Sequence, residues 1–142
     1  MNDDKRFYFA AKAFIVSEGK FLIVQRSESE KNPLYWELPG GRMDFGETVS
    51  ENLKRELVEE VGLQDIEVIA PIGVWSFMIN ENNQLVGSTF LCKSSTSEIK
   101  LSFEHKNYAW ITKDELGKYN VFPGIIEEMS SWDWEYIENV CR

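Results

Sequence analysis

The sequence of 142 residues contains only two cysteines, Cys92 and Cys141, and nothing around them suggests a metal-binding or redox pair. It also lacks any stretch that approaches the roughly 18–20 apolar residues of a membrane span. The first six residues are too polar and too acidic for a signal peptide. Two lone thiols without an export signal lead us to expect a cytoplasmic protein with no membrane partner.

An excess of positive charge is missing as well, because the formal net charge is −9. Proteins that bind polyanions usually present a basic face, so duplex nucleic acid is not expected as a partner. An acidic protein can still bind small phosphates where cations stand between the two sets of negative charge. Carboxylates that cluster in the sequence are therefore the candidates for binding a cation and, through it, a phosphate.

Internal repeats, low-complexity tracts and Pro/Gly/Ser-rich linkers are also absent, and the length is that of one domain, so we expect a single domain over residues 1–142. Strands before and after a central helix predict an α+β fold, or a mixed β-sheet flanked by helices. The expected strands are 7–16, 21–26, 36–38 (ended by Pro39–Gly41), 66–79 as one or two strands around Pro71, 84–93, 98–103 and 108–111. The expected helices are 48–61, a short one opened by a capping box at Thr112 to Glu115, and a last one from Pro123 with a core stripe of Ile125, Met129, Trp132 and Tyr136.

The helix over 48–61 has clear signals at both ends. Thr48 can act as the N-cap, and Glu51 three residues later completes a capping box. Gly62 suits the left-handed position after the last turn, and Leu63 supplies the hydrophobic contact that often follows it. The ends of this helix are therefore the most secure boundaries in the sequence.

Three carboxylates share one face of that helix. At about 100° per residue, Glu56, Glu59 and Glu60 fall within about 100° of one another. Like charges at this spacing destabilise a helix. The ordinary interpretation of such a charge run is a solvated acidic face, which would lie opposite the apolar stripe.

Two features favour a cation site instead. The apolar stripe adjoins the Glu56 and Glu60 face, which places these carboxylates at the margin of the buried surface, where unpaired like charges are costly; the stripe consists of Val49, Leu53, Leu57 and Val61. A glycine-containing loop, 38–41, precedes the helix and lets the backbone approach a ligand closely. Arg55 can hold a carboxylate in place by a charge-assisted bond. Oxygen ligands in this number suit Mg²⁺ or Mn²⁺.

The loop and the helix are joined by a pattern of fixed spacing. It reads Gly41, five residues, Glu47, seven residues, and then Arg55-Glu56-Leu57-Val58-Glu59-Glu60-Val61-Gly62-Leu63. This pattern resembles the signature of the Nudix hydrolase family, of the MutT type, and every fixed position matches. The segment 36–40, which leads into the signature, is also similar to the corresponding segment of that family. A second similar feature is Trp110 followed by Glu115-Leu116.

The resemblance implies the Nudix fold, an αβα sandwich, and Mg²⁺-dependent hydrolysis of a phosphoanhydride bond, with Mn²⁺ as a substitute. It implies that Arg55 and Glu47 brace the site. The residues that match metal ligands of the family are Gly41, Glu56, Glu59 and Glu60, and the residues expected to serve catalysis are Arg55, Glu56, Glu59 and Glu60. In the mechanism it implies, a carboxylate takes a proton from water, which attacks one phosphorus in line.

The general base has two candidates. Glu56 is the best match within the signature, whereas other family members carry the base on a downstream loop. Glu104, in the loop before the strand of Trp110, is our candidate for a further acidic metal ligand, and a solvated loop glutamate is the alternative interpretation. His105, the only histidine, has a side chain suited to acid–base work, but a lone histidine is more often structural.

The linked group of the substrate is not readable from the sequence, and three hypotheses remain open. The first is hydrolysis of free nucleotides such as (deoxy)nucleoside triphosphates, the second hydrolysis of nucleotide sugars of the ADP-ribose type, and the third a catalytically silent regulator. The complete signature argues against the third. A homodimer stays open. Aromatic side chains that could stack on a base, although each is more often a core residue, are Phe9, Tyr35, Trp75, Phe77 and Phe90.

Overall fold

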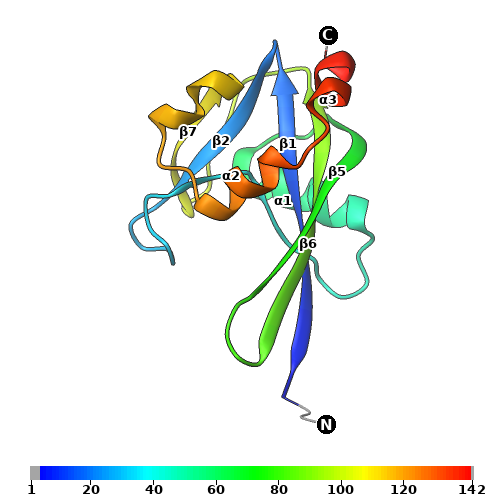
Figure 1. The fold of residues 1–142 in the computed structure, drawn as a ribbon, viewed down its shortest axis with the longest axis vertical. Coiled ribbons are helices and arrows are strands. Elements are labelled where there is room, and N and C mark those ends of the chain that lie inside the picture. Colours follow the sequence, from blue (N-terminus) through cyan, green and yellow to red (C-terminus); the bar gives the residue numbers. More distant parts are fainter. Residues whose placement is uncertain (1–3, 142) are drawn as a thin grey trace.

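A computed structural model describes residues 4–141 and arranges them as a mixed β-sheet with helices on both faces (Figure 1). The first three residues of the N-terminal segment considered above lie outside this range. The strands are β1 (Arg6–Ser17), β2 (Lys20–Arg26), β3 (Trp36–Glu37), β4 (Gly40–Arg42), β5 (Ile66–Met78), β6 (Asn83–Ser94) and β7 (His105–Ile111). The helices are α1 (Val49–Val61), the 3₁₀ helix η1 (Lys113–Lys118), α2 (Pro123–Ser130) and α3 (Trp134–Val140).

Strand β1 organises the sheet. It runs parallel to β6 from the pair Arg6 and Asn83 to the pair Val16 and Lys93, and it forms an antiparallel hairpin with β2. The strand order over the described residues is β3-β2-β1-β6-β5, while β4 pairs with β1 and β7 pairs with β2. Parallel and antiparallel pairs in one sheet confirm the predicted fold class.

Two apolar layers lie on opposite faces of this sheet. One layer joins the inner face of α1 to β1, β2 and β6, and it includes Leu53, Leu57 and Val61. The other layer packs α2 and α3 against Phe14, Ile23 and Leu91, through Met129, Trp132 and Ile137. Leu57 is fully buried, so its truncation to alanine would cost about 2–5 kcal/mol. The carboxylate helix is therefore held firmly against the sheet.

The expected strand over 98–103 is wrong. This segment instead runs past the C-terminal end of α1, where the backbone N–H groups of Lys100 and Ser102 donate to the carbonyls of Val61 and Glu60, each at 3.0 Å. The last carbonyls of a helix lack partners within the helix, and the segment supplies two of the missing donors. The apolar side chains of this segment pack in the layer beneath α1 rather than beside a neighbouring strand.

The last expected helix is divided in two. Helix α2 ends at Ser130, and Asp133 then caps α3 by accepting a hydrogen bond from the backbone N–H of Tyr136 at 3.1 Å. The break shifts the helical phase, so Ile137 takes the buried position and Tyr136 is 39% exposed. The core prediction was correct for Met129 and Trp132, which are buried, and wrong for Tyr136.

The glycine pair after Pro39 does not simply end a strand. Gly40 and Gly41 begin β4, which pairs with Ala11 and Lys12 of β1. A Cβ on Gly40 would lie 2.2 Å from the carbonyl oxygen of Ala11, so only glycine permits this approach.

Strand β5 continues through Pro71 with irregular pairing on both sides of it. Within residues 4–141 no helix is long and apolar enough to cross a membrane.

Candidate functional site

Both ends of α1 are built as the sequence predicts. The Thr48 hydroxyl accepts from the backbone N–H of Glu51 at 3.1 Å, and the Glu51 carboxylate accepts from the backbone N–H of Thr48 at 2.9 Å. Gly62 adopts the left-handed conformation with φ 70°. These local bonds set where the helix starts and stops, and so they set which way its three carboxylates face.

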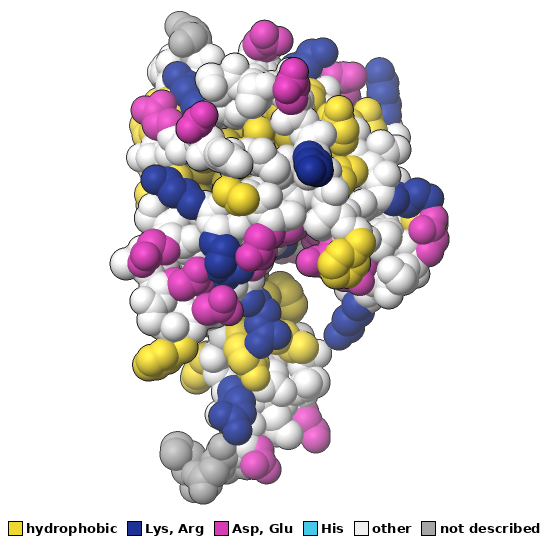
Figure 2. Space-filling model, turned by 180° about the vertical axis from the view of Figure 1, so that it is seen from behind, with side chains coloured by type: hydrophobic (Ala, Val, Ile, Leu, Met, Phe, Trp, Pro, Cys, Tyr) yellow, Lys and Arg dark blue, Asp and Glu magenta, His cyan; other side chains and the backbone are white. Residues whose placement is uncertain are grey.

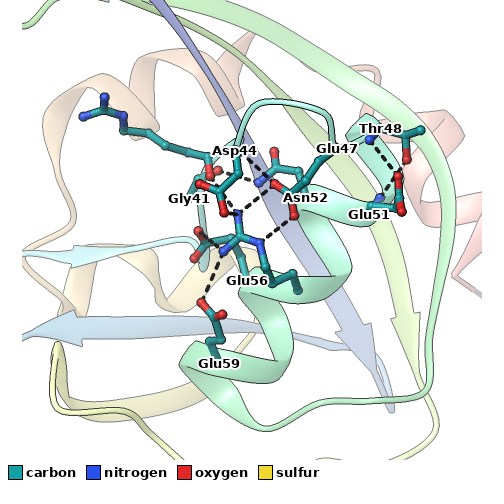
Figure 3. Close-up of polar contacts among 10 residues, drawn as sticks. Gly41, Asp44, Glu47, Thr48, Glu51, Asn52, Glu56 and Glu59 are labelled. Atoms are coloured by element: carbon teal, nitrogen blue, oxygen red, sulfur yellow. Dashed lines mark hydrogen bonds and ion pairs between the residues drawn. The ribbon is translucent and has the colours of Figure 1, made fainter.

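Arg55 is the centre of an ion-pair network beside α1. Its carboxylate partners Glu47, Glu56 and Glu59 are labelled in Figure 3. Its Nε and Nη2 atoms donate to the two oxygens of Glu47 at 2.6 and 2.9 Å. Its Nη1 atom donates to Glu56 at 3.1 Å and to Glu59 at 3.3 Å. These bonds to Arg55 are the main reason that the pKa of Glu47 is lowered to about 2. The expected bracing contacts of Glu47 and Arg55 are therefore present.

Glu56 lies directly against the loop that precedes α1. A Cβ added to Gly41 would fall 2.6–2.7 Å from the carboxylate atoms of Glu56. The carbonyl oxygen of Gly41 accepts a hydrogen bond from the Asn52 side-chain amide at 3.2 Å. The absent side chain of Gly41 thus leaves space in which a backbone carbonyl and a carboxylate come together.

Glu60 is the buried member of the three, with 4% of its surface exposed. Its Oε2 atom accepts from the backbone N–H of Gly40 at 3.2 Å. The pKa of Glu60 is raised to about 9, mainly by burial, with a smaller upward effect of the neighbouring Glu56 and Glu37 carboxylates and an opposing effect of Lys12. A carboxyl in this position remains ionised at neutral pH only when more positive charge lies beside it.

A second set of charges, which the sequence did not reveal, lies on the inner side of Glu60. Glu37 accepts from Arg26 Nη1 at 3.1 Å and pairs with Nε2 of His105 at 2.9 Å. Burial pushes the pKa of Glu37 upward, but Lys12, His105 and Arg26 outweigh it and hold the pKa at about 2. The one feature of the sequence that could have indicated this set of charges was the glutamate between the apolar residues of the expected strand 36–38.

Asn52 is a further residue of the candidate site that the sequence did not single out. It is fully buried on α1, and its amide holds the Gly41 carbonyl as described above. A polar residue beside Leu53, on the apolar side of the helix, was the signal that could have found it. Asn52 thus contacts the Gly41 carbonyl from α1, while the pairing of β4 with β1 holds the backbone of Gly41.

The donor set suits a divalent cation. Glu56 lies close enough to Glu60 to disfavour the charge of Glu60. Carboxylate and carbonyl oxygens are the ligands that Mg²⁺ and Mn²⁺ prefer. Glu59 is more exposed, with 59% of its side chain accessible, and Arg55 connects it to Glu56. Within the part of the chain that the structure describes, no three such side chains already meet at one point. A cation would therefore have to draw them together.

The other predicted residues lie at different distances from this cluster. Glu104 is exposed, and its side chain makes no hydrogen bond or ion pair within residues 4–141, although its loop adjoins Glu60 through Ser102. Phe9 and Phe90 pack against the core beneath α1. All five aromatic candidates are at least partly accessible, and Phe77 is the most exposed of them, at 53%.

The face that carries α1 is charged across its middle. Figure 2 shows acidic side chains gathered there around basic ones, above a narrower part of the molecule where hydrophobic side chains are exposed. The exposed hydrophobic residues of the strands β1 and β5 are Phe7, Val74, Phe77 and Met78. Charge and apolar surface thus lie next to each other on this side.

Known proteins resemble this chain in sequence and in fold. A family model described as NUDIX domain matches residues 7–137. The chain is 29% identical over 119 residues to a nucleoside triphosphatase, NudI, of Escherichia coli, and the match covers 75% of this chain and 83% of that protein. The MutT protein of Methanosarcina mazei Go1 has a TM-score of 0.82 and 27% identity, covering 93% of this chain and 96% of that one. An ADP-ribose pyrophosphatase of Streptococcus suis 89-1591 has a TM-score of 0.64 and 25% identity, covering 82% and 81%.

Proposed function

Because the chain belongs to the Nudix family, it is a hydrolase of pyrophosphate bonds in nucleotides, and we propose that it acts on a (deoxy)nucleoside triphosphate with Mg²⁺ as cofactor. The observation that carries the cofactor proposal is the pair of neighbouring carboxyl groups, Glu56 against Gly41 and Glu60 against Gly40. The observation that favours the substrate is the similarity to a nucleoside triphosphatase. We further propose that residues 1–142 form one catalytic domain and that it works in the cytoplasm.

The proposed ligands of the cation come from β4, from α1 and from the loop before β7. They are the carbonyl of Gly41 and the side chains of Glu56, Glu59 and Glu60, with Glu104 as a further ligand and Mn²⁺ as a substitute for Mg²⁺. When bound, the cation supplies neutralisation of phosphate charge and activation of water. All these groups belong to one chain, so the site does not require the homodimer that the sequence leaves open.

The residues of the chain have separate tasks in this proposal. Arg55 keeps Glu56 and Glu59 apart at a fixed spacing, because one guanidinium nitrogen donates to both. Glu56 accepts the proton of the attacking water. The water oxygen then forms a bond to phosphorus, and the bond from that phosphorus to the bridging oxygen breaks. The electron pair of the broken bond stays on the departing phosphate. Because the protein forms no covalent bond to the substrate, positioning and charge supply most of the rate enhancement.

A substrate panel tests the proposal. Purified protein is incubated with nucleoside triphosphates, nucleotide sugars and dinucleotides, and the products are resolved by chromatography with Mg²⁺, with Mn²⁺ and with a chelator. We expect turnover of at least one triphosphate that stops with the chelator and returns with either metal. Turnover in metal-free buffer would contradict the cofactor assignment.

A second candidate is hydrolysis of a nucleotide sugar of the ADP-ribose type, favoured by the likeness to the Streptococcus suis pyrophosphatase. The same panel separates the two, because ADP-ribose would give AMP and ribose phosphate whereas a triphosphate gives a nucleoside monophosphate or diphosphate. Binding without turnover of any compound would support the silent regulator instead.

A further inference from the structure

His105 is a buried residue with one ring nitrogen bound and the other without a partner. Its side chain is 2% exposed. Nε2 lies 2.9 Å from Oε2 of Glu37. Nδ1 lies 3.5 Å from Oε1 of Glu60 and makes no hydrogen bond within residues 4–141. A buried polar nitrogen without a hydrogen-bond partner destabilises the folded state. The orientation of Nδ1 toward Glu60 therefore requires an explanation.

The orientation of the ring is set from the Glu37 side. Glu37 is itself held by Arg26, and by Lys12 at 4.0 Å, so its carboxylate has a defined place. An ionised carboxylate only accepts hydrogen bonds, and Nε2 of His105 therefore donates to it. This bond fixes the plane of the imidazole and directs Nδ1 at Glu60.

The backbone reinforces the same geometry. The N–H of His105 donates to the carbonyl of Ser102 at 3.3 Å, and the N–H of Ser102 donates to the carbonyl of Glu60 at 3.0 Å. The loop before β7 is thus fastened to α1 at the residue whose side chain His105 faces. Glu60 is held on its other oxygen by the backbone N–H of Gly40.

We propose that His105 is a positioning residue for the cation site: with a proton on both ring nitrogens, it donates to Glu37 from Nε2 and to the Glu60 carboxylate from Nδ1. The inference rests on the proposed function, because it assumes that Glu60 is a ligand of a divalent cation. Each carboxylate oxygen has two lone pairs, so Glu60 can accept from Gly40 and face His105 while retaining a lone pair for the cation. His105 completes a carboxylate–imidazole–carboxylate chain from Arg26 to the carboxylate helix.

Two substitutions separate the two nitrogens. In His105→Asn the amide lies at the distance of Nδ1 from the backbone, whereas in His105→Gln it lies at the distance of Nε2. The glutamine variant therefore keeps the contact with Glu37 and loses the one with Glu60, and the asparagine variant does the reverse. Mn²⁺ binding is measured by electron paramagnetic resonance titration, and unfolding by circular dichroism, on both variants and on Lys106→Gln, a neighbouring exposed residue whose partner is Glu28.

We expect His105→Gln to weaken Mn²⁺ binding about tenfold and His105→Asn to change it by less than about threefold, since a group that orients a metal ligand typically contributes ten- to hundredfold in affinity. The melting temperature should fall more in His105→Asn, which loses the bond to Glu37. Lys106→Gln should match wild type in both measurements. Equal affinities for the glutamine variant and wild type, or losses of affinity that follow the loss of stability in both variants, would overturn the inference.

A measurement on the unaltered protein covers the case in which a variant fails to fold. His105 is the only histidine, so the imidazole ¹⁵N resonances in a nuclear magnetic resonance spectrum belong to it alone. Addition of Mg²⁺ should shift the Nδ1 resonance more than the Nε2 resonance. If wild type binds Mn²⁺ and neither resonance responds to Mg²⁺, the role of His105 is refuted while the cation site stands. If wild type binds no Mn²⁺, the cofactor proposal fails and the inference fails with it.

Discussion

Arg55 holds both carboxylate oxygens of Glu47, through Nε at 2.6 Å and Nη2 at 2.9 Å. The two residues are eight positions apart, and the pair connects the loop after β4 to the middle of α1. With two of its nitrogens engaged by Glu47, the guanidinium presents its third nitrogen, Nη1, to Glu56 and Glu59. One planar group therefore sets the spacing of two proposed cation ligands.

Arg55→Lys tests this relationship, because lysine keeps the charge but cannot form two parallel bonds to Glu47. We expect kcat to fall by roughly ten- to hundredfold, the usual effect of removing a group that orients a metal ligand. The fold should persist, since Arg55 belongs to neither apolar layer. Steady-state kinetics and circular dichroism provide the check. A lysine variant with wild-type kcat would show that the bidentate pair is unnecessary.

The two neighbouring glycines should respond differently to alanine. In Gly40→Ala the new Cβ meets the backbone oxygen of Ala11, which cannot move without disturbing β1, and the φ of 135° is unfavourable for alanine. We expect a large loss of melting temperature. In Gly41→Ala the Cβ meets only the end of the Glu56 side chain, which can rotate away. We therefore expect Gly41→Ala to fold and to bind Mn²⁺ more weakly than wild type. A folded Gly41→Ala variant with wild-type Mn²⁺ affinity would contradict the proposal that the cation binds beside Gly41.

The stability of the metal-free protein should depend on pH through Glu60. Its pKa is about 9 in the folded chain and near its ordinary value of 4.5 in the unfolded chain. Between these values the folded state holds one more proton than the unfolded state, so the free energy of unfolding falls as pH rises. Melting temperatures in chelator at pH 5, 7 and 9 should decrease for wild type and decrease less for Glu60→Gln.

The same variant separates a cation site from a structural ion pair. Without metal, Glu60→Gln should be no less stable than wild type at neutral pH, because the amide, unlike the carboxyl of wild type, need not take up a proton when the chain folds, yet it should lose catalysis. A large loss of melting temperature in this variant would mean that Glu60 serves mainly as an ionised partner of His105.

The general base is identified by comparing Glu56→Gln with Glu104→Gln. A ligand that is not the base should be partly rescued by more Mn²⁺, whereas loss of the base lowers kcat by roughly 10²–10⁴-fold without rescue. We expect the larger loss for Glu56→Gln and a smaller, metal-sensitive loss for Glu104→Gln. If Glu104→Gln has wild-type kinetics at low Mg²⁺, Glu104 is an ordinary loop residue. If it abolishes activity while Glu56→Gln is rescued, the base lies on the loop.

Where the sequence misled, tertiary contacts altered a locally reasonable pattern. Ile99 and Leu101 alternate as in a strand, but they pack against the layer beneath α1 while their backbone follows its last carbonyls. Tyr136 has helical spacing from Trp132, but the break between α2 and α3 changes the phase. In both cases the apolar residues were identified correctly and their geometry was not, since periodicity alone does not say which surface a segment meets.

The sequence by itself determined α1, its boundaries and the face on which Glu56, Glu59 and Glu60 lie, because caps and helical spacing depend on bonds between residues at most a few positions apart. Only the tertiary structure decided that Glu37 and His105, 68 residues apart, meet behind Glu60. That meeting requires β3 and β7 to flank β2 in one register. Register between distant strands results from the packing of the whole sheet rather than from any local pattern, which is why the buried partner of the carboxylate helix was visible only in the folded chain.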